Sequence, residues 1–229
     1  MELGINSFVR LNIDEEVDKI NPCTPQGEEM KMTNRGMIKN YKILIAGVGG
    51  QGIVYLSNLI VEAAMLAKIP VSVSEIHGLS QRGGVVTSGI GLGEHCTGFY
   101  GTAGVDFLIG LEPLETQRCI SYLHKNSCVI FGNNRIQPYS VNAQMASYPD
   151  VNEFAGYLKE QCRDVTYIGG FPKEIDAVLY NIFMLGRATR METFPLTAGQ
   201  LEEAINANVT GYFKEKTLTA FKLGMNYTE

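Results

Sequence analysis

An apolar run, a glycine cluster and a helical repeat follow one another near residue 42. Residues 42–46 (Lys-Ile-Leu-Ile-Ala) form a short apolar run that is typical of a buried parallel strand. Apolar residues then recur at helical spacing and predict a helix over residues 52–68. Pro70 ends this helix, and residues 71–74 (Val-Ser-Val-Ser) are expected as a second strand. A strand, a helix and a strand within about 35 residues predict a βαβ unit with a right-handed crossover and a parallel sheet.

Strands and helices continue to alternate toward the end of the chain. Residues 78–84 read as a polar, glycine-rich loop, and residues 85–92 as a strand or one arm of a hairpin. Further strands are expected at 105–110, 128–131 and 165–168, and further helices at 113–123, 152–161, 174–185, 197–206 and 214–224. This order predicts one doubly wound, Rossmann-like α/β domain with a mostly parallel sheet and helices on both faces.

The first 40 residues differ in character from the rest. They are charged and polar apart from a short apolar patch at residues 8–13, so we expect residues 1–40 to be a flexible N-terminal extension and residues 41–229 to be the domain. The sequence leaves open whether the native start is Met1 or Met37.

Charge and cysteine content exclude several classes of protein. Nineteen basic and 24 acidic residues give a formal charge of −5 without any basic run, which argues against nucleic-acid or anionic-membrane binding. The five cysteines are isolated, which argues against a zinc ribbon or a ferredoxin-type cluster, and no metal site is expected. The uncharged stretch between Lys42 and Glu62 approaches the length of a membrane span, but glycines interrupt it. Because the N-terminus lacks the pattern of a signal peptide, we expect a cytoplasmic protein.

The glycine cluster fits the pattern GxGxxG between a strand and a helix. Its candidate cofactor-binding residues are Gly47, Gly49, Gly50, Gln51 and Gly52. Glycines allow the backbone to approach a phosphate closely, and the following helix offers free N–H groups. Glu75 could be the acidic residue expected at the end of the second strand. The alternative is that the glycines only pack the helix against the sheet.

The segment 75–84 places unusually many polar groups at the carboxyl end of a strand. Its candidate ligand contacts are Ser80, Gln81, Arg82, Gly83 and Gly84. Arg82 could form a bidentate pair with a phosphate or a carboxylate. His77 could carry a proton or be a hydrogen-bonded structural residue, and docking of a partner subunit is the alternative for the whole loop. No residue of this chain is assigned as catalytic, although His77 and Arg82 are the candidates.

Other polar residues have structural interpretations. Glu112 lies at the end of a predicted strand and Glu115 in the first turn of the following helix, where carboxylates suit the helix dipole and cap the helix. Asp106 at the start of that strand is also expected to be structural.

Four segments together resemble the gamma-type domain of the 2-oxoacid:ferredoxin oxidoreductase family, with the indolepyruvate-oxidising members as the nearest likeness. They are residues 46–52 (AGVGGQG), 74–84 (SEIHGLSQRGG), 106–115 (DFLIGLEPLE) and 181–186 (NIFMLG). The resemblance implies a small subunit of an enzyme that oxidatively decarboxylates a 2-oxoacid, such as indolepyruvate or another arylpyruvate, to an acyl-CoA. It also implies that thiamine diphosphate and iron–sulfur clusters belong to a larger (alpha) partner subunit. Coenzyme A is then a co-substrate, ferredoxin accepts the electrons, and this chain alone binds no cofactor and is inactive.

The sequence departs from the family at one motif and leaves other readings open. The family often has a His and an Arg two residues apart after the paired glycines, whereas Gly89 and Gly91 stand here. Pyruvate, branched-chain 2-oxoacids and 2-oxoglutarate stay open as substrates, as does the subunit stoichiometry. The alternative functions are a free-standing nucleotide- or CoA-binding protein and a scaffold that completes a partner's fold.

Overall fold

The computed structural model describes residues 40–78 and 84–228. Residues 1–39 of the expected N-terminal extension therefore lie outside the described residues, as does most of the polar loop that follows the second strand.

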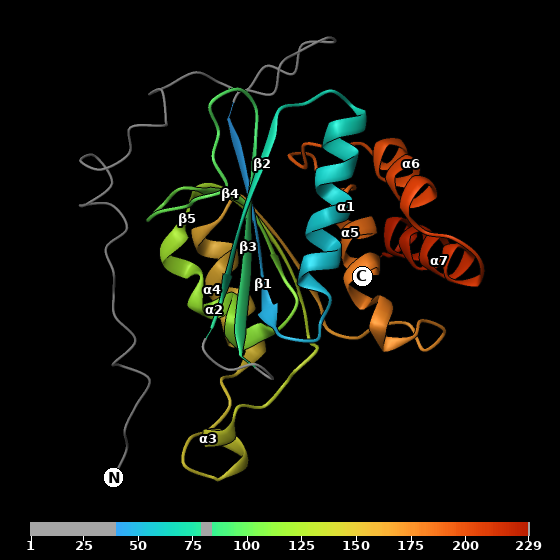
Figure 1. Ribbon diagram of the computed structural model, residues 1–229. Coiled ribbons are helices and arrows are strands. Elements are labelled where there is room, and N and C mark those ends of the chain that lie inside the picture. The colour runs from blue at the N-terminus through green and yellow to red at the C-terminus, as the bar shows by residue number, and fades with distance from the viewer. Residues whose placement is uncertain (1–39, 79–83, 229) are drawn as a thin grey trace.

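One mixed sheet organises the domain (Figure 1). It has six strands in the order β2-β3-β1-β4-β5-β6. Their bounds are β1 Tyr41–Val48, β2 Val71–His77, β3 Val85–Leu92, β4 Val105–Gly110, β5 Leu123–Gly132 and β6 Asp164–Ile168. Strands β1, β4, β5 and β6 form parallel ladders, whereas β3 pairs antiparallel with both β1 and β2. The predicted strand at residues 85–92 is thus confirmed, as one arm of a hairpin with β2.

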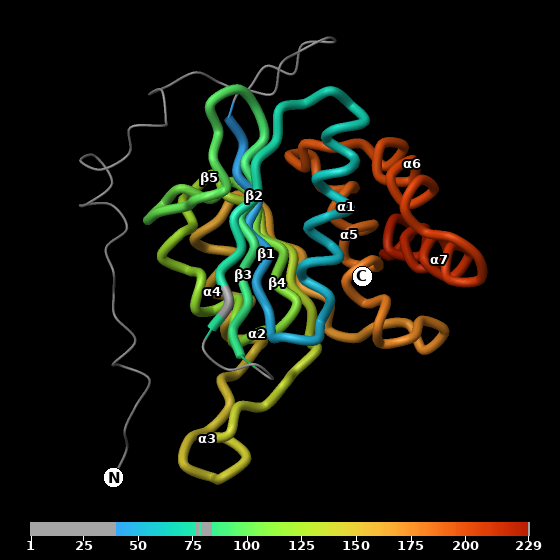
Figure 2. Tube along the Cα trace, in the orientation of Figure 1, coloured from blue at the N-terminus to red at the C-terminus, as the bar shows by residue number. Residues whose placement is uncertain are grey.

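Helices cover both faces of the sheet, which confirms the predicted fold class. One face packs against α1 (Ile53–Leu66) and α5 (Tyr180–Ala188), and α6 (Ala198–Asn208) and α7 (Tyr212–Asn226) pack against these two helices. The other face packs against α4 (Val151–Gln161), with α2 (Pro113–Arg118) at the end of β4. Short helical turns complete the chain: η2 (Ile120–Tyr122), α3 (Tyr139–Asn142) and η3 (Ala177–Leu179). The tube view in Figure 2 shows the same layers.

The burial of both faces of β1 explains why its sequence is largely apolar and does not alternate with polar residues. Ile43 and Ile45 join the core beneath α1, whereas Leu44 and Ala46 join the core beneath α4. Both faces of a central strand are buried, so every position favours an apolar side chain. The 19 uncharged residues between Lys42 and Glu62 divide between β1 and α1. Within residues 40–78 and 84–228, no helix combines the length and apolarity that crossing a membrane requires.

Three predictions about elements need correction. Strand β2 runs parallel to β1, but β3 lies between them, so the first βαβ unit does not form adjacent parallel strands. The helix predicted over 113–123 ends at Arg118 and continues as the tighter turn η2. The helix predicted over 174–185 begins only at Tyr180, after η3. Apolar periodicity does not separate a 3₁₀ turn from the end of an α-helix, because both repeat about every three residues.

The glycines at positions 89 and 91 are required by a segment that crosses β3. A Cβ atom at Gly91 would lie 2.5 Å from the carbonyl oxygen of Thr97, and one at Gly89 would overlap the carbonyl oxygen of Gly98. A Cβ at Gly98 would in turn lie 2.5 Å from the amide nitrogen of Ser74. The backbone of residues 96–98 thus fills the space that any side chain at position 89 or 91 would need.

Candidate functional site

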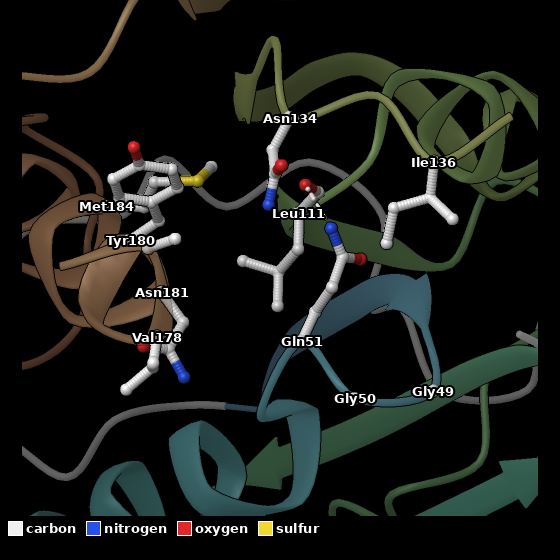
Figure 3. Close-up of a pocket in the computed structure, with 11 residues that line it drawn as sticks. Gly49, Gly50, Gln51, Leu111, Asn134, Ile136, Val178, Tyr180, Asn181 and Met184 are labelled. Atoms are coloured by element: carbon white, nitrogen blue, oxygen red, sulfur yellow. Dashed lines mark hydrogen bonds between the residues drawn. The ribbon is translucent and has the colours of Figure 1, made fainter. Parts of the chain in front are cut away.

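A pocket of about 380 Å³ opens at the edge of the sheet where the parallel strands end, here called the carboxyl edge. The chain leaves β1 toward β2 on one side and leaves β4 toward β5 on the other, so the pocket lies where the strand order reverses. Open α/β sheets bind ligands at such a point. The lining residues are Gly49, Gly50, Gln51, Leu111, Asn134, Ile136, Ala177, Val178, Tyr180, Asn181 and Met184 (Figure 3).

The glycine cluster forms one wall of this pocket and needs its glycines. Gly50 has φ +102° and Gly52 has φ +75°, a left-handed backbone that side chains disfavour. At Gly47, a Cβ atom would lie 2.6 Å from Gln51 Oε1. The backbone therefore turns sharply from β1 into α1, as the motif predicts.

Two amide side chains hold the glycine turn in place. Gln51 Oε1 accepts a hydrogen bond from the Val48 amide at 2.8 Å, and Gln51 Nε2 donates to the carbonyl oxygen of Leu111 at 3.0 Å. Asn181 Nδ2, on α5, donates to the carbonyl oxygen of Gly52 at 3.2 Å. The turn is thus fixed to the end of β4 and to α5. A direct contact between Gln51 and a ligand stays a prediction.

The N-terminus of α1 offers positive character to the pocket wall. Gly52 is its N-cap, no side chain caps it, and its first turn contains no acidic residue. The first N–H groups of a helix have no partners within the helix, and the helix dipole favours an anion there. A phosphate group is the ligand chemistry that this geometry suits.

The two ends of the polar loop lie at the carboxyl edge of the sheet, where β2 ends and β3 begins. The Gly49 amide donates to the carbonyl oxygen of Gly84 at 3.0 Å, which places the start of β3 beside the glycine turn. His77 is the last residue of β2 and lies opposite Val86 in the ladder. The structure therefore brings the Gly84 end of this loop to Gly49 at the pocket, and the His77 end lies two strands away at the same edge of the sheet. Four of the predicted contacts lie outside the described residues: Ser80, Gln81, Arg82 and Gly83.

A buried carboxylate lies behind the pocket. Glu112 Oε2 accepts a hydrogen bond from the Glu115 amide at 2.9 Å, so Glu112 caps α2 as predicted. Its Oε1 accepts from the Tyr148 hydroxyl and, at 3.4 Å, from the Ile136 amide. Burial, together with the Glu112 carboxylate, raises the pKa of Tyr148 well above its usual range, which keeps its hydroxyl a donor. Asp106 is also structural, since its Oδ2 accepts from the Lys42 amide at 2.7 Å.

The carboxyl group of Glu115, next to Glu112, has a shifted pKa that a substitution can test. Burial raises the pKa of Glu115, although Arg118 at 3.5 Å opposes the shift. Its Oε2 atom is buried and has no hydrogen-bond partner among the described residues. A raised pKa means that Glu115 favours the folded state only below its ordinary pKa, and this contribution is lost as the pH rises. We expect Glu115→Gln to raise the free energy of unfolding at pH 7 by roughly 1 kcal/mol.

This gain should shrink as the pH falls through about 4.5, because the native carboxyl group is then neutral as well. Urea unfolding at pH 7 and pH 4 measures the difference. A variant that unfolds at lower urea than the native chain at pH 7 would contradict the interpretation.

Sequence reasoning missed part of the pocket wall. Tyr180 and Met184 fall in the helix predicted over 174–185, and Met184 is buried, but both residues also line the pocket. Asn134 follows β5 at the carboxyl edge, so the rule that strand ends bind ligands would have pointed to it. Asn181 carries no such signal, because its partner Gly52 is 129 residues away along the chain.

The described lining of the pocket consists mainly of amide, backbone and apolar groups. Apart from the Tyr180 phenol, the described residues that line it carry no titratable side chain. Nor do the described ranges 40–78 and 84–228 contain a group of three or more His, Cys, Asp or Glu residues that could hold a metal ion. The arrangement offers amide donors, backbone N–H groups and an apolar floor, which suits a ligand with a phosphate and an apolar part.

Proteins from several organisms are similar to this chain over most of its length. Indolepyruvate oxidoreductase subunit IorB of Archaeoglobus fulgidus is 33% identical over 187 residues, which cover 80% of this chain and 93% of that protein. The protein of the same name from Methanothermobacter thermautotrophicus is 35% identical over 191 residues, covering 81% of this chain and 96% of that protein.

Solved structures share the fold. A keto/oxoacid ferredoxin oxidoreductase gamma subunit from Geobacter sulfurreducens matches with a TM-score of 0.55 at 19% identity, covering 80% of this chain and 95% of that one. The 2-oxoglutarate:ferredoxin oxidoreductase from Magnetococcus marinus, solved with 2-oxoglutarate, coenzyme A and succinyl-CoA bound, matches with a TM-score of 0.56 at 15% identity. The match covers 81% of this chain and 30% of that one. The family described as pyruvate ferredoxin/flavodoxin oxidoreductase matches residues 42–227, and the chain belongs to this family.

Proposed function

We propose that this chain is the small subunit of a 2-oxoacid:ferredoxin oxidoreductase and that it works only together with a larger catalytic subunit. One observation on this member of the family carries the proposal. The pocket where the strand order reverses has binding groups, but its described lining has no acid, base or nucleophile other than a tyrosine. Such a pocket can position a substrate, whereas the bond-breaking groups must come from elsewhere.

The proposed reaction is the oxidative decarboxylation of a 2-oxoacid with coenzyme A, giving an acyl-CoA, carbon dioxide and two electrons for ferredoxin. We assign indolepyruvate or a related arylpyruvate as the substrate, in line with the names of the relatives. Thiamine diphosphate and the iron–sulfur clusters belong to the larger subunit in this proposal. Three of the four described cysteines, Cys96, Cys119 and Cys128, are buried, and burial raises the pKa of Cys119 to about 12, which disfavours the thiolate that an iron–sulfur cluster needs.

The pocket fits a part of coenzyme A. The N-terminus of α1 suits the diphosphate group, and the apolar residues of the lining suit an uncharged part of the molecule. The predicted contacts Ser80, Gln81 and Arg82 belong to the loop whose two ends reach this edge, and in this proposal they complete the phosphate site. We place the complex in the cytoplasm.

Reconstitution tests the proposal directly. The full chain is co-expressed with the larger subunit, and the purified complex is assayed for CoA-dependent reduction of a dye by indolepyruvate. We expect a stable complex and turnover that falls at least a hundredfold when this chain is omitted. A larger subunit that shows the same turnover alone would refute the proposal.

A thermal-shift screen of the isolated chain addresses the alternative, a free-standing nucleotide- or CoA-binding protein. A ligand that binds only the folded state raises the Tm, by an amount set by its concentration relative to Kd. NAD, FAD, ADP and CoA are compared at equal concentration. A large shift in a chain that binds no larger subunit would favour the alternative.

A further inference from the structure

An uncharged segment projects from the carboxyl edge beside the pocket. Residues 136–149, here called the docking arm, connect β5 to α4 and contain α3. Charged residues make up 19% of the chain, yet none occurs between Arg135 and Asp150. Figures 1 and 2 show α3 standing apart from the sheet and from the other helices.

The docking arm exposes apolar side chains that the fold does not use. No residue from 133 to 150 is buried. Tyr139 is 82% exposed and Met145 is 76% exposed, the highest values among the large apolar side chains of the described residues. Tyrosine and methionine are enriched in protein interfaces, whereas Lys, Glu and Asp are depleted there. The exposed tyrosine and methionine and the absence of charge are therefore features that the arm shares with protein interfaces.

The arm is nevertheless fixed where it leaves the domain. The Asn133 amide donates to the carbonyl oxygen of Ile168 at 2.9 Å, and both Ile136 and Tyr148 donate to the buried Glu112. The Arg135 guanidinium lies 5.3 Å from the centre of the Tyr148 ring. Within the arm, the Ala143 amide bonds to the carbonyl oxygen of Tyr139 at 2.8 Å. A projection that is ordered before binding loses less entropy when a partner binds.

Exposed apolar side chains stand on both sides of the pocket. Ile136 belongs both to the arm and to the pocket lining, and Val178 lies on the opposite side of the pocket in Figure 3. Ile136 is 39% exposed and Val178 is 72% exposed. A protein that binds the arm down to its base at Ile136 would thus also reach the pocket.

We propose that the docking arm inserts into an uncharged groove of the larger catalytic subunit and so holds the pocket against that subunit's active site. This inference rests on the proposed function. The described lining of the pocket supplies binding groups without an acid, base or nucleophile beyond a tyrosine. In this proposal the catalytic groups of the larger subunit therefore approach the mouth of the pocket. The base of the arm lies at that mouth, because Ile136 lines the pocket. The absence of charge argues for a groove recognised by shape and apolar contact rather than by ion pairs.

The test compares two double variants of the full chain. Tyr139→Ser with Met145→Ser removes the exposed apolar side chains of the arm. Phe99→Ser with Met65→Ser is the control, because these residues are 69% and 60% exposed but lie toward the opposite edge of the sheet. Affinity for the larger subunit is measured by titration, and the mass of each isolated chain by light scattering.

We expect the arm variant to bind the larger subunit at least tenfold more weakly, which corresponds to about 1.4 kcal/mol, while its Tm stays that of the native chain. The control variant should bind as the native chain does. Equal affinity of native chain and arm variant would overturn the docking inference while leaving the proposed function intact. A native chain that fails to bind the larger subunit would overturn both. A native dimer that the arm variant dissociates would assign the arm to a second copy instead.

Discussion

Gly224→Ala is expected to lower the free energy of unfolding by about 3 kcal/mol, because it forces apart two helices in contact. A Cβ atom at Gly224 in α7 would overlap the carbonyl oxygen of Phe183 in α5 and lie 2.8 Å from its carbonyl carbon. The contact is reciprocal, since a Cβ at Gly186 in α5 would overlap the carbonyl oxygen of Phe221 in α7. Backbone atoms cannot turn aside as a flexible side chain can, so one helix must shift.

Gly156→Ala in α4 is the matched control for this substitution. A Cβ atom at Gly156 would have no neighbour within 4 Å, and the residue lies inside a helix of similar regularity. Alanine should there stabilise the protein by up to about 1 kcal/mol, since glycine loses more backbone entropy on folding. Urea unfolding of the two variants measures opposite shifts of the midpoint. Stabilisation by both substitutions would show that α5 and α7 are not in close contact.

Glu112→Ala is expected to cost about 3 kcal/mol and to loosen the base of the docking arm. The carboxylate accepts hydrogen bonds from the Glu115 amide, the Ile136 amide and the Tyr148 hydroxyl. Alanine removes the cap of α2, worth about 1 kcal/mol, and leaves the other donors without their acceptor at about 1–3 kcal/mol. Chymotrypsin should cleave the arm several-fold faster, because Tyr139 and Tyr148 lie within it.

Glu112→Gln should have a smaller effect than Glu112→Ala on stability and arm cleavage, because the amide retains one oxygen that can accept a hydrogen bond. We expect about half the loss of stability and a smaller rise in the cleavage rate. Urea midpoints and the rate of arm cleavage, read by mass spectrometry, are measured on the same preparations. Unchanged cleavage in Glu112→Ala would mean that the arm does not depend on this carboxylate.

The sequence was most informative where local rules decide the structure. The apolar run of β1, the glycine turn and the helical repeat of α1 are local, and the structure has all three in the predicted places. The insertion of β3 between β1 and β2 was not predictable in this way, because strand order depends on pairing between residues far apart. The start of α5 at Tyr180 was also missed, since the preceding turn repeats its apolar residues like a helix.

The candidate site was predicted in part for the same reason. The glycine turn and its position at the end of β1 could be predicted, because both depend on local sequence. The opposite wall depends on α5, and only the tertiary fold brings Asn181 to Gly52. The departure at Gly89 and Gly91 was visible in the sequence, but its cause was not, because the segment that fills the space follows β3 and folds back over it.

The position of β3 also has a consequence for synthesis of the chain. Strand β1 leaves the ribosome first, yet its two neighbours in the sheet are β3 and β4, which end only at Leu92 and Gly110. Until β3 is made both edges of this apolar strand are unpaired, and one stays unpaired until β4 is made, which favours aggregation. The core beneath α1 further needs Phe221 of α7, close to the end of the chain. The core beneath α1 therefore cannot close until α7 has been synthesised.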